Sequence, residues 1–198
     1  GDELDVRIID SDDKESRNGP GELLVRRKGS EPQRGFFSGY FKNREATEEA
    51  WADGWFHTGD IVRREDDGSM FFVDRKKNVI RRSGENIAAV EVESALMRHP
   101  AIRAAAVAAV ADPVRGDEVF ACLKVEGEAG PELAGEIVSW CLGQLAYYKA
   151  PGYIAFVDAL PLTSTQKIQR RELKELAERL VLDAATVDTR AMKKRTAA

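Results

Sequence analysis

Cysteine and histidine are scarce in this sequence of 198 residues, which contains two of each. Cys122 and Cys141 have apolar neighbours and no Cys-x-x-Cys spacing, so they form neither a zinc-binding nor a redox motif. His57 has no carboxylate or nucleophile at a matching spacing, so a hydrogen-bonded structural histidine is a better interpretation than a general base. The sequence therefore predicts no metal site and two buried, reduced thiols of the kind found in cytosolic proteins.

Long apolar runs and an excess of one charge are also missing. No stretch approaches the roughly 20 apolar residues that a membrane-spanning helix needs, and no signal peptide opens the chain. The formal net charge is only -4, which does not favour a nucleic-acid-binding surface. We therefore expect a cytoplasmic protein without a membrane span or a nucleic-acid partner, and the composition leaves a homo-oligomer open. The start at Gly1, without a methionine and close to strand-like residues, predicts a fragment.

The most informative stretch runs from Asp74 to Ile87, where basic residues flank an apolar pair and lead into a Ser-Gly-Glu-Asn turn. Side chains over residues 79–83 alternate with the period of a β-strand, and Gly84 lets the backbone reverse. This pattern predicts an arginine-rich β-hairpin that can approach a phosphorylated ligand closely. On this stretch alone, a solvated basic hairpin without a ligand is the favoured alternative.

Residues 1–73 are predicted to be rich in β-strands, with a short helix over 48–51 that Thr47 would cap. Asp60 follows Gly59 at the mouth of one of these strands. A carboxylate there can accept hydrogen bonds from both hydroxyls of a ribose, and the glycine lets the sugar come near. A simple turn without a ligand is the alternative interpretation.

The second part of the sequence alternates between helical and strand patterns. Helices are predicted at residues 90–99 and 131–149, and strands at 118–125 and 153–157. The alanine-rich residues 101–111 fit either a helix or a buried strand, because periodicity alone does not decide between them.

Lys167 is a single lysine in a small polar loop that precedes a basic helix start. A flexible loop of this kind can deliver an ammonium group to a phosphate, although most lysines in polar loops are simply solvated. Residues 179–198 are polar and basic, and they are predicted to form a flexible tail.

Three motifs occur in one order along the chain: Trp55-Phe56-His57-Thr58-Gly59-Asp60, Asp74-Arg75-x-Lys77, and Pro161-x-Thr163-x-x-x-Lys167-Ile168-x-Arg170. Their order and spacing resemble the C-terminal part of the adenylate-forming enzymes, which include acyl-CoA synthetases, luciferases and the adenylation domains of peptide synthetases. The resemblance covers residues 4 to about 176. It is particularly close to acyl-CoA ligases of the crotonobetaine/carnitine and fatty-acid type, through residues 54–60, 72–75 and 84–87.

The resemblance implies a reaction in two steps. A carboxylic acid and ATP, with magnesium, give acyl-AMP and pyrophosphate, and the thiol of CoA then displaces AMP to form a thioester. By matching position, Asp60 and Arg75 would bind the ribose of ATP or AMP. Lys167 would be the catalytic lysine, whose charge offsets negative charge at the reacting α-phosphate and carboxylate. Lys77 would be the hinge about which the C-terminal domain rotates.

That rotation would remove Lys167 and bring the hairpin turn to the site. The residues that the resemblance assigns to CoA binding are Arg81, Ser83, Gly84 and Glu85. Gly84 would line the pantetheine tunnel, where any side chain would obstruct the thiol, and Arg82 would lie near the same route and meet phosphates. The family usually has Ser-Gly before the lysine, whereas this chain has Thr165-Gln166, and glutamine restricts the backbone where glycine would not.

The expected fold class is α+β: a distorted β-barrel-like subdomain, then a small domain with a β-ribbon and a mixed sheet flanked by helices. Residues 1–76 would be the last β-subdomain of the large N-terminal adenylation domain, residues 77–178 the mobile C-terminal domain, and residues 179–198 the tail. The phosphate loop and the acyl-binding segments of the family do not occur here, so the fragment alone is expected to be inactive and to need the missing N-terminal domain. One alternative is an adenylation domain that serves a carrier protein, but no carrier-domain sequence follows Leu173. The other alternative is a non-catalytic docking module.

Overall fold

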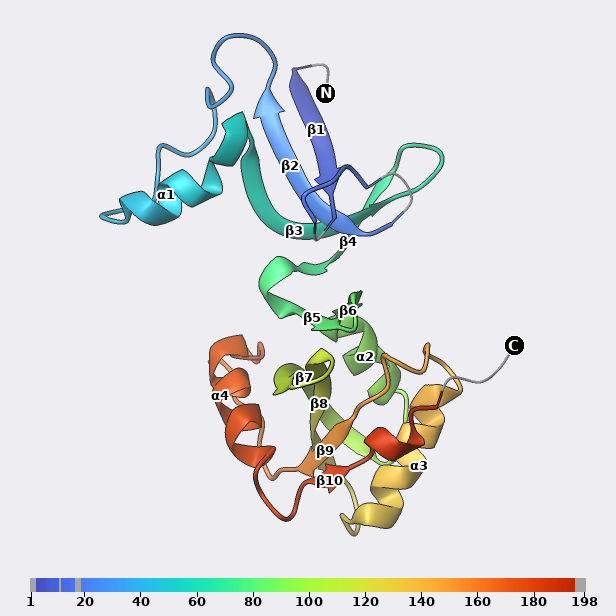
Figure 1. The fold of residues 1–198 in the computed structure, drawn as a ribbon. Helices are drawn as coiled ribbons and strands as arrows, with labels where there is room; N and C mark the ends of the chain where they lie inside the picture. The colour runs from blue at the N-terminus through green and yellow to red at the C-terminus, as the bar shows by residue number, and fades with distance from the viewer. Residues whose placement is uncertain (1–2, 11, 17–18, 195–198) are drawn as a thin grey trace. The chain divides into compact units, whose positions relative to one another are not determined.

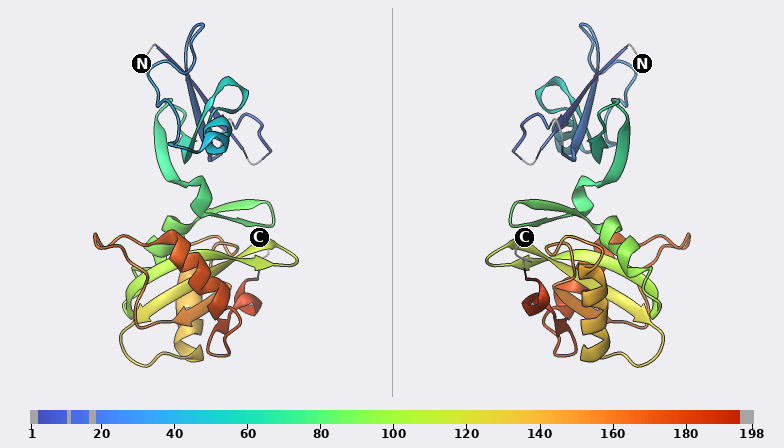
Figure 2. Two further views of the ribbon diagram at one scale, coloured as in Figure 1. Left: turned by 90° about the vertical axis from the view of Figure 1, so that its left-hand side faces the viewer. Right: turned by 90° about the vertical axis from the view of Figure 1, so that its right-hand side faces the viewer.

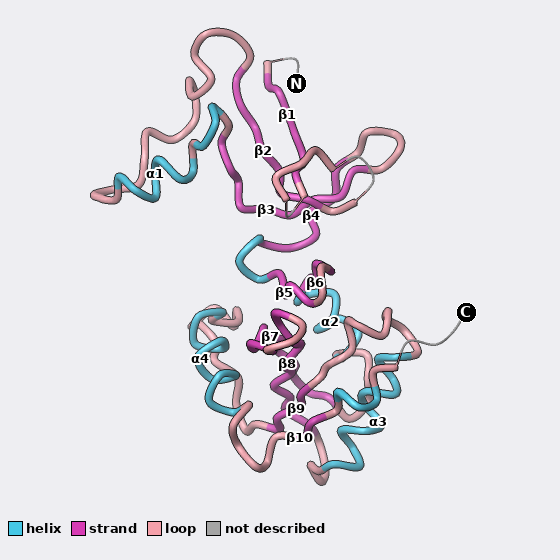
Figure 3. Tube along the Cα trace, in the orientation of Figure 1, coloured by secondary structure: helices cyan, strands magenta, loops and turns pink. Residues whose placement is uncertain are grey.

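The computed structural model describes residues 3–10, 12–16 and 19–194, and its fold is mixed α+β, as the sequence predicts (Figure 1). The chain divides into two compact units, Gly1–Lys77 and Asn78–Ala198. Each unit has its own β-sheet, and Figure 3 distinguishes the strands from the helices.

The first unit is built on a four-stranded antiparallel sheet with strand order β1-β2-β3-β4. Its strands are β1 (Leu4–Ile9), β2 (Gly21–Arg27), β3 (Phe56–Arg64) and β4 (Met70–Arg75). The connection from β2 to β3 contains α1 (Arg44–Ala50) and the 3-10 helix η1 (Ala52–Gly54). A small apolar core of Ile9, Leu24 and Trp55 supports the sheet.

Helix α1 begins earlier than the sequence predicts. Asn43 is its N-cap, because the Asn43 side chain accepts a hydrogen bond from the amide of Ala46 at 3.0 Å. Thr47 lies inside the helix, where its hydroxyl donates to the carbonyl of Asn43 and accepts from the amide of Tyr40. The prediction of Thr47 as the cap is therefore wrong: asparagine caps helices at least as well as threonine, and it comes one turn earlier.

The second unit contains a six-stranded mixed sheet. Five of its strands have the order β10-β9-β8-β5-β6, and the sixth, β7, also pairs with β8. Strands β7 and β8 pair antiparallel along their length, and β8 and β9 pair parallel. The strands are β5 (Val79–Arg82), β6 (Glu85–Ala88), β7 (Ile102–Asp112), β8 (Gly116–Val125), β9 (Tyr153–Phe156) and β10 (Val187–Asp188).

The alanine-rich segment, which fits either a helix or a strand by its sequence, forms strand β7. Its alternate residues enter two different cores: Ala105, Val107 and Ala109 face one, and Ala106, Ala108 and Val110 face the other. A strand that is covered on both faces has no polar side to mark its period, which is why periodicity left the choice open. Small alanine side chains also let the helices approach the sheet closely.

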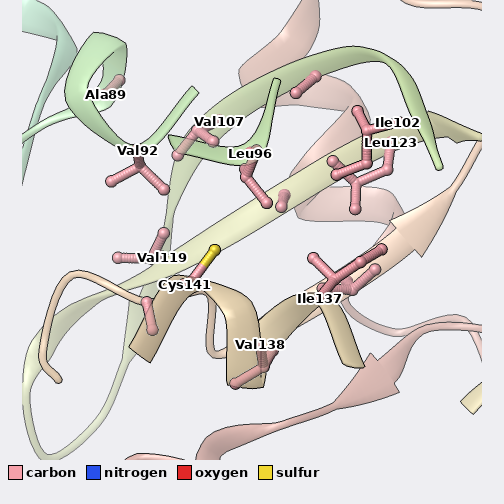
Figure 4. Packing of buried hydrophobic residues seen from close by; sticks show 14 of the residues in the cluster. Ala89, Val92, Leu96, Ile102, Val107, Val119, Leu123, Ile137, Val138 and Cys141 are labelled. Carbon is pink, nitrogen blue, oxygen red and sulfur yellow. The ribbon is translucent and has the colours of Figure 1, made fainter. Parts of the chain in front are cut away.

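Helices cover both faces of this sheet (Figure 1). The first core receives α2 (Ala89–Leu96) and α3 (Pro131–Leu142), and Figure 4 shows the packing of Val92, Leu96, Ile137 and Cys141 within it. The second core receives α4 (Arg170–Leu180). Helix α3 starts with Pro131 in the first turn, as predicted, but it ends at Leu142 rather than near residue 149.

Both cysteines are buried and free, one in each core. Burial raises the pKa of Cys141 to about 11 and that of Cys122 to about 12, so both remain protonated near neutral pH. The prediction of buried thiols is confirmed.

Residues 179–194 differ from the flexible tail that the sequence predicts. After α4, the chain adds β10 to the sheet beside β9 and then forms the 3-10 helix η3 (Arg190–Met192). Thr189 donates to the carbonyl of Pro151 at 2.9 Å, and Lys193 is buried. The polar side chains of this segment have buried partners that its composition does not reveal. Residues 195–198 of the predicted tail lie outside the described residues.

Candidate functional site

Asp60 and Arg75 face one another on neighbouring strands of the first unit, where β3 and β4 pair them directly. Arg75 Nη1 lies 2.9 Å from Asp60 Oδ1, but its aligned hydrogen bond goes to the carbonyl of Thr58 at 3.2 Å. Among the described residues, no donor makes an aligned hydrogen bond to Asp60 Oδ1, which is a buried atom. Oδ1 thus lies buried beside a cation, while the Asp60 side chain as a whole is 29% exposed, so carboxylate surface remains for a ligand hydroxyl.

Gly59 gives the chain the conformation that this site needs. Its φ is +68°, a left-handed value that side chains rarely adopt, and an added Cβ would meet no atom within 4 Å. The backbone beside Asp60 is therefore open to a ligand.

A buried carboxylate that the sequence analysis missed holds this loop in place. Glu22, on β2, is only 4% exposed and accepts hydrogen bonds from the amide of Gly59 at 3.2 Å and from Lys76 Nζ at 2.7 Å. His57 Nδ1 lies 3.3 Å from the same carboxylate. Burial alone would raise the pKa of Glu22, but the hydrogen bonds from Lys76 and His57 outweigh it and lower that pKa.

The residues around Lys77 connect the two units. Lys76–Asn78 form the short 3-10 helix η2, and Lys77 is exposed at the last position of the first unit. Lys76 is tied to Glu22 inside the first unit, whereas Ile80 is buried in the core of the second. Lys77 is thus the first of three residues between these two anchored positions.

The predicted hairpin forms from β5 and β6, which a two-residue turn of Ser83 and Gly84 connects. Both turn residues have positive φ, +51° and +84°, as in the type I′ turn that suits the twist of a hairpin. The four predicted CoA-binding residues, Arg81, Ser83, Gly84 and Glu85, are all exposed at this end of the hairpin.

Arg82, in contrast, is buried. The prediction that it lies near the route of CoA and meets a phosphate is therefore wrong. Its side chain points into the second unit and Nε donates to Glu118 Oε2 at 2.9 Å. The guanidinium is buried and paired with Glu118, so it is not available to a phosphate.

Lys167 lies in a tight turn between β9 and α4. The amide of Thr163 donates to the carbonyl of Lys167 at 2.8 Å, and the amide of Lys167 donates to Thr163 Oγ1 at 3.1 Å. Gln166, which replaces the glycine usual in the family, has a φ of +62°. The loop thus keeps a glycine-like turn, and Lys167 stays exposed.

The start of α4, just after this turn, is fixed by a partly buried ion pair. Arg170 donates to both oxygens of Glu93 on α2, at 2.7 and 2.9 Å, and to the carbonyl of Val107. Glu93 in turn accepts from the amide of Val107 at 2.8 Å. Arg170 belongs to the motif around Lys167, but nothing in the sequence points to Glu93 as its partner, because 77 residues separate the two.

Within the second unit, the structure does not bring Lys167 and the hairpin turn together. Figure 2 shows the loop before α4 and the β5–β6 hairpin extending from different sides of this unit. The residues that the structure describes contain no group of three or more metal-ligating side chains, and none of their helices has the length and apolar character to cross a bilayer.

Residues 91–167 match the family model of the AMP-binding enzyme C-terminal domain. The chain carries the C-terminal domain of the adenylate-forming enzymes. Among curated members of this family, the probable CoA ligase CCL11 of Humulus lupulus is 44% identical over 142 residues, which cover 71% of this chain and 25% of that protein. The long-chain-fatty-acid–CoA ligase of Escherichia coli O157:H7 is 37% identical over 177 residues, 87% of this chain and 30% of that protein.

Solved structures of adenylate-forming enzymes have the same fold. The o-succinylbenzoate CoA synthetase of Bacillus subtilis, in complex with its acyl-adenylate intermediate, is 31% identical with a TM-score of 0.69. The match covers 87% of this chain and 34% of that one. This chain thus spans about a quarter to a third of the length of such relatives.

Proposed function

We propose that this chain is the C-terminal portion of an ATP-dependent acyl-CoA synthetase. The parent enzyme joins a carboxylic acid to AMP, releases pyrophosphate, and then transfers the acyl group to the thiol of CoA. The observation that carries the proposal is the 37% to 44% identity to named CoA ligases over 142 to 177 residues. Residues 1–76 then complete the large adenylation domain, and the second unit, including β10 and η3 beyond residue 178, forms the mobile domain.

In this proposal Asp60 and Arg75 bind the ribose of ATP and of the acyl-adenylate. A ribose presents two neighbouring hydroxyl donors, and the partly exposed Asp60 carboxylate can accept from them. Arg75 Nη1, 2.9 Å from Asp60 Oδ1, orients that carboxylate. Glu22 positions the loop by holding the amide of Gly59, the residue before Asp60.

Lys167 acts in the first step. Attack of the carboxylate on the α-phosphate brings two negative groups together, and an ammonium at this point lowers the energy of the crowded transition state. The exposed side chain on a short turn can reach such a group, and the ion pair between Arg170 and Glu93 fixes the base of that turn. Magnesium enters as part of the MgATP substrate.

The second step needs a different surface of the same domain. The Lys167 turn and the Ser83–Gly84 turn extend from different sides of the second unit (Figure 2), so rotation about Lys77 presents them in succession. Arg81, Ser83, Gly84 and Glu85 then line the path of CoA. The absence of a side chain at Gly84 leaves room for the thiol arm.

The experiment that tests this function uses the full-length protein that contains this chain. It is incubated with MgATP, CoA and a panel of short, long and aromatic carboxylic acids, and pyrophosphate, AMP and thioester are quantified. Formation of AMP and thioester in equal amounts supports the proposal. Adenylation followed by transfer to a carrier protein or an amine, with CoA ignored, would instead make this chain part of another kind of adenylating enzyme.

A further inference from the structure

The C-terminal segment of residues 187–193, here called the C-terminal strap, contacts the β7–β8 turn at two buried carboxylates. One is Glu118, at the start of β8, and the other is Asp112, at the end of β7. Neither carboxylate has a role in the reaction proposed above. Glu118 accepts a hydrogen bond from Arg82 of the β5–β6 hairpin, and Asp112 accepts one from the amide of Arg115, whose carbonyl binds the hairpin turn.

Glu118 lies between two cations, and its side chain is fully buried. Lys193 Nζ donates to Oε1 at 2.5 Å, and Arg82 Nε, from the hairpin, donates to Oε2 at 2.9 Å. The side chains of Glu118 and Lys193 are 0% exposed. Gly152 packs so closely on Glu118 that an added Cβ would lie 2.5 Å from its carboxyl carbon, so Gly152 limits the carboxylate on that side.

Asp112 provides the second contact. Its Oδ1 accepts from the amides of Val114 and Arg115, and its Oδ2 accepts from Arg190 of the strap at 3.3 Å. Burial alone would raise the pKa of Asp112, but these hydrogen bonds lower it below its ordinary value. Arg190 is itself held by Asp188 and lies over the ring of Tyr153.

The β7–β8 turn then holds the turn end of the hairpin. The amide of Ser83 donates to the carbonyl of Arg115 at 2.8 Å, and the amide of Arg81 donates to Asp117 Oδ2 at 3.0 Å. Strand β5 has a single registered pair with β8, between Arg82 and Gly116. The base of the hairpin is anchored in the core by its isoleucines, but its turn end depends on these polar contacts.

We propose that the C-terminal strap positions the hairpin turn for the CoA-dependent step, with Lys193 and Glu118 as positioning residues. This inference rests on the proposed function, because the hairpin matters only if CoA passes along it. Lys193 and Arg82 share one buried carboxylate. Loss of the lysine leaves Arg82 as the one cation bonded to Glu118 among the described residues and lets that carboxylate shift toward the vacated side. A shift there is transmitted to the turn, which is one residue away from Arg82.

The charged groups around Lys193 are Glu118 on β8, Arg82 on β5 and Arg115 in the β7–β8 turn. Burial lowers the pKa of Lys193 to about 8, although Glu118 opposes this change. At neutral pH the lysine is charged and completes the pair with Glu118.

The positional part of the inference is tested on the 198-residue chain by amide hydrogen exchange. Lys193→Met is expected to raise the exchange rates of the Ser83 and Arg81 amides about tenfold, because their acceptors lie in the turn that the strap supports. Amides of α3 serve as the internal reference, and Lys194→Met, an exposed neighbour with the same change of side chain, is the matched control. Equal rates in Lys193→Met and Lys194→Met would overturn the inference. If Lys193→Met does not fold, the half-exposed Arg190→Met takes its place with the same expectation.

The functional part is tested in the full-length enzyme by separating the two half-reactions. Lys193→Met is expected to slow thioester formation from supplied acyl-AMP about tenfold or more, while pyrophosphate exchange stays within about twofold of wild type. An equal loss in both half-reactions, or none in either, would overturn a positioning role. If wild-type enzyme forms acyl-AMP but never a thioester, the proposed function fails, and the exchange experiment still decides whether the strap braces the hairpin.

Discussion

Gln166 shows how one residue can depart from a family pattern without changing the local fold. Its φ of +62° is the conformation that the usual glycine would take. A left-handed conformation costs a residue with a side chain about 1–2 kcal/mol, whereas glycine costs about 0.5–1 kcal/mol in backbone entropy. The strain at Gln166 thus exceeds the entropy that a glycine would lose there, by up to about 1 kcal/mol.

We therefore expect Gln166→Gly to stabilise the chain by up to about 1 kcal/mol. Urea unfolding of the 198-residue chain measures this change. Ser164→Gly is the matched control in the same exposed loop, because Ser164 has no positive φ to relieve and glycine there only adds disorder to the unfolded chain. Destabilisation of equal size in both variants would show that Gln166 is not strained.

Lys167 gives a prediction about chemistry rather than stability. In the full-length enzyme, Lys167→Ala is expected to slow adenylation by about 10²- to 10³-fold, the usual cost of removing one preorganised charge from a transition state. Thioester formation from supplied acyl-AMP should change little. Lys174→Ala, an exposed lysine one turn into α4, is the control. Comparable losses in both half-reactions would contradict the role of Lys167.

Lys193 makes the stability of the chain depend on pH in an unusual direction. Its pKa is about 8 in the folded chain, against about 10.4 for an unfolded lysine. Between these values the unfolded chain binds a proton that the folded chain does not. The free energy of unfolding therefore rises with pH across this window, by up to about 1.4 kcal/mol per pH unit.

The measurement is the difference in unfolding free energy between wild type and Lys193→Met from about pH 7 to pH 10. We expect wild type to gain relative to the variant as the pH rises from about 8. Lys194→Met should give a flat difference, because this lysine is exposed. A flat difference for Lys193→Met would mean that the lysine titrates normally and is not buried in solution.

At the scale of elements, the sequence predicts structure best where one face of a strand or helix is polar. Helix α2 follows its pattern, because the apolar residues Val92 and Leu96 recur four apart on one buried face. The β5–β6 hairpin follows from its Ser83–Gly84 turn rather than from an alternation of polar and apolar residues. Strand β7 carries no such signal, since helices cover both of its faces. The prediction also fails for the C-terminal strap, but there the residues are polar. Thr189 and Lys193 are buried against partners far away in the sequence, so composition alone favours a flexible tail.

The hairpin turn provides a prediction with an internal control. Gly84→Trp in the full-length enzyme is expected to leave adenylation within about threefold and to reduce thioester formation by about 10²-fold, because the side chain would fill the path of the thiol. Gly68, in the β3–β4 turn, has nearly the same φ, +85° against +84°, and equally open surroundings. Gly68→Trp therefore introduces the same backbone strain at a place without a proposed role. Loss of the second step in both variants would trace the effect to strain rather than to obstruction.

At the scale of the whole chain, the residues that organise the proposed site are the ones hardest to find in the sequence. Glu22, Glu93 and Glu118 are buried carboxylates that pair with Lys76, Arg170 and Lys193 across 54, 77 and 75 residues. Each carboxylate sits in a strand or helix where a charged residue normally points to solvent. Motif order identifies Asp60, Arg75 and Lys167 as candidates, but only tertiary structure reveals the carboxylates that hold their loops.

The whole-molecule prediction concerns what this chain does alone. We expect it to form neither acyl-AMP nor a thioester, because the proposed chemistry needs a phosphate loop and an acyl pocket that the resemblance assigns to a separate N-terminal part. Mixing the chain with a separately expressed N-terminal part should restore thioester formation in a concentration-dependent way, since the two would have to associate. A Lys167→Ala version of the chain should restore only the second step, from supplied acyl-AMP. Equal activity of the N-terminal part with and without this chain would show that the chain is a docking module and that Lys167 and Gly84 have no part in the chemistry.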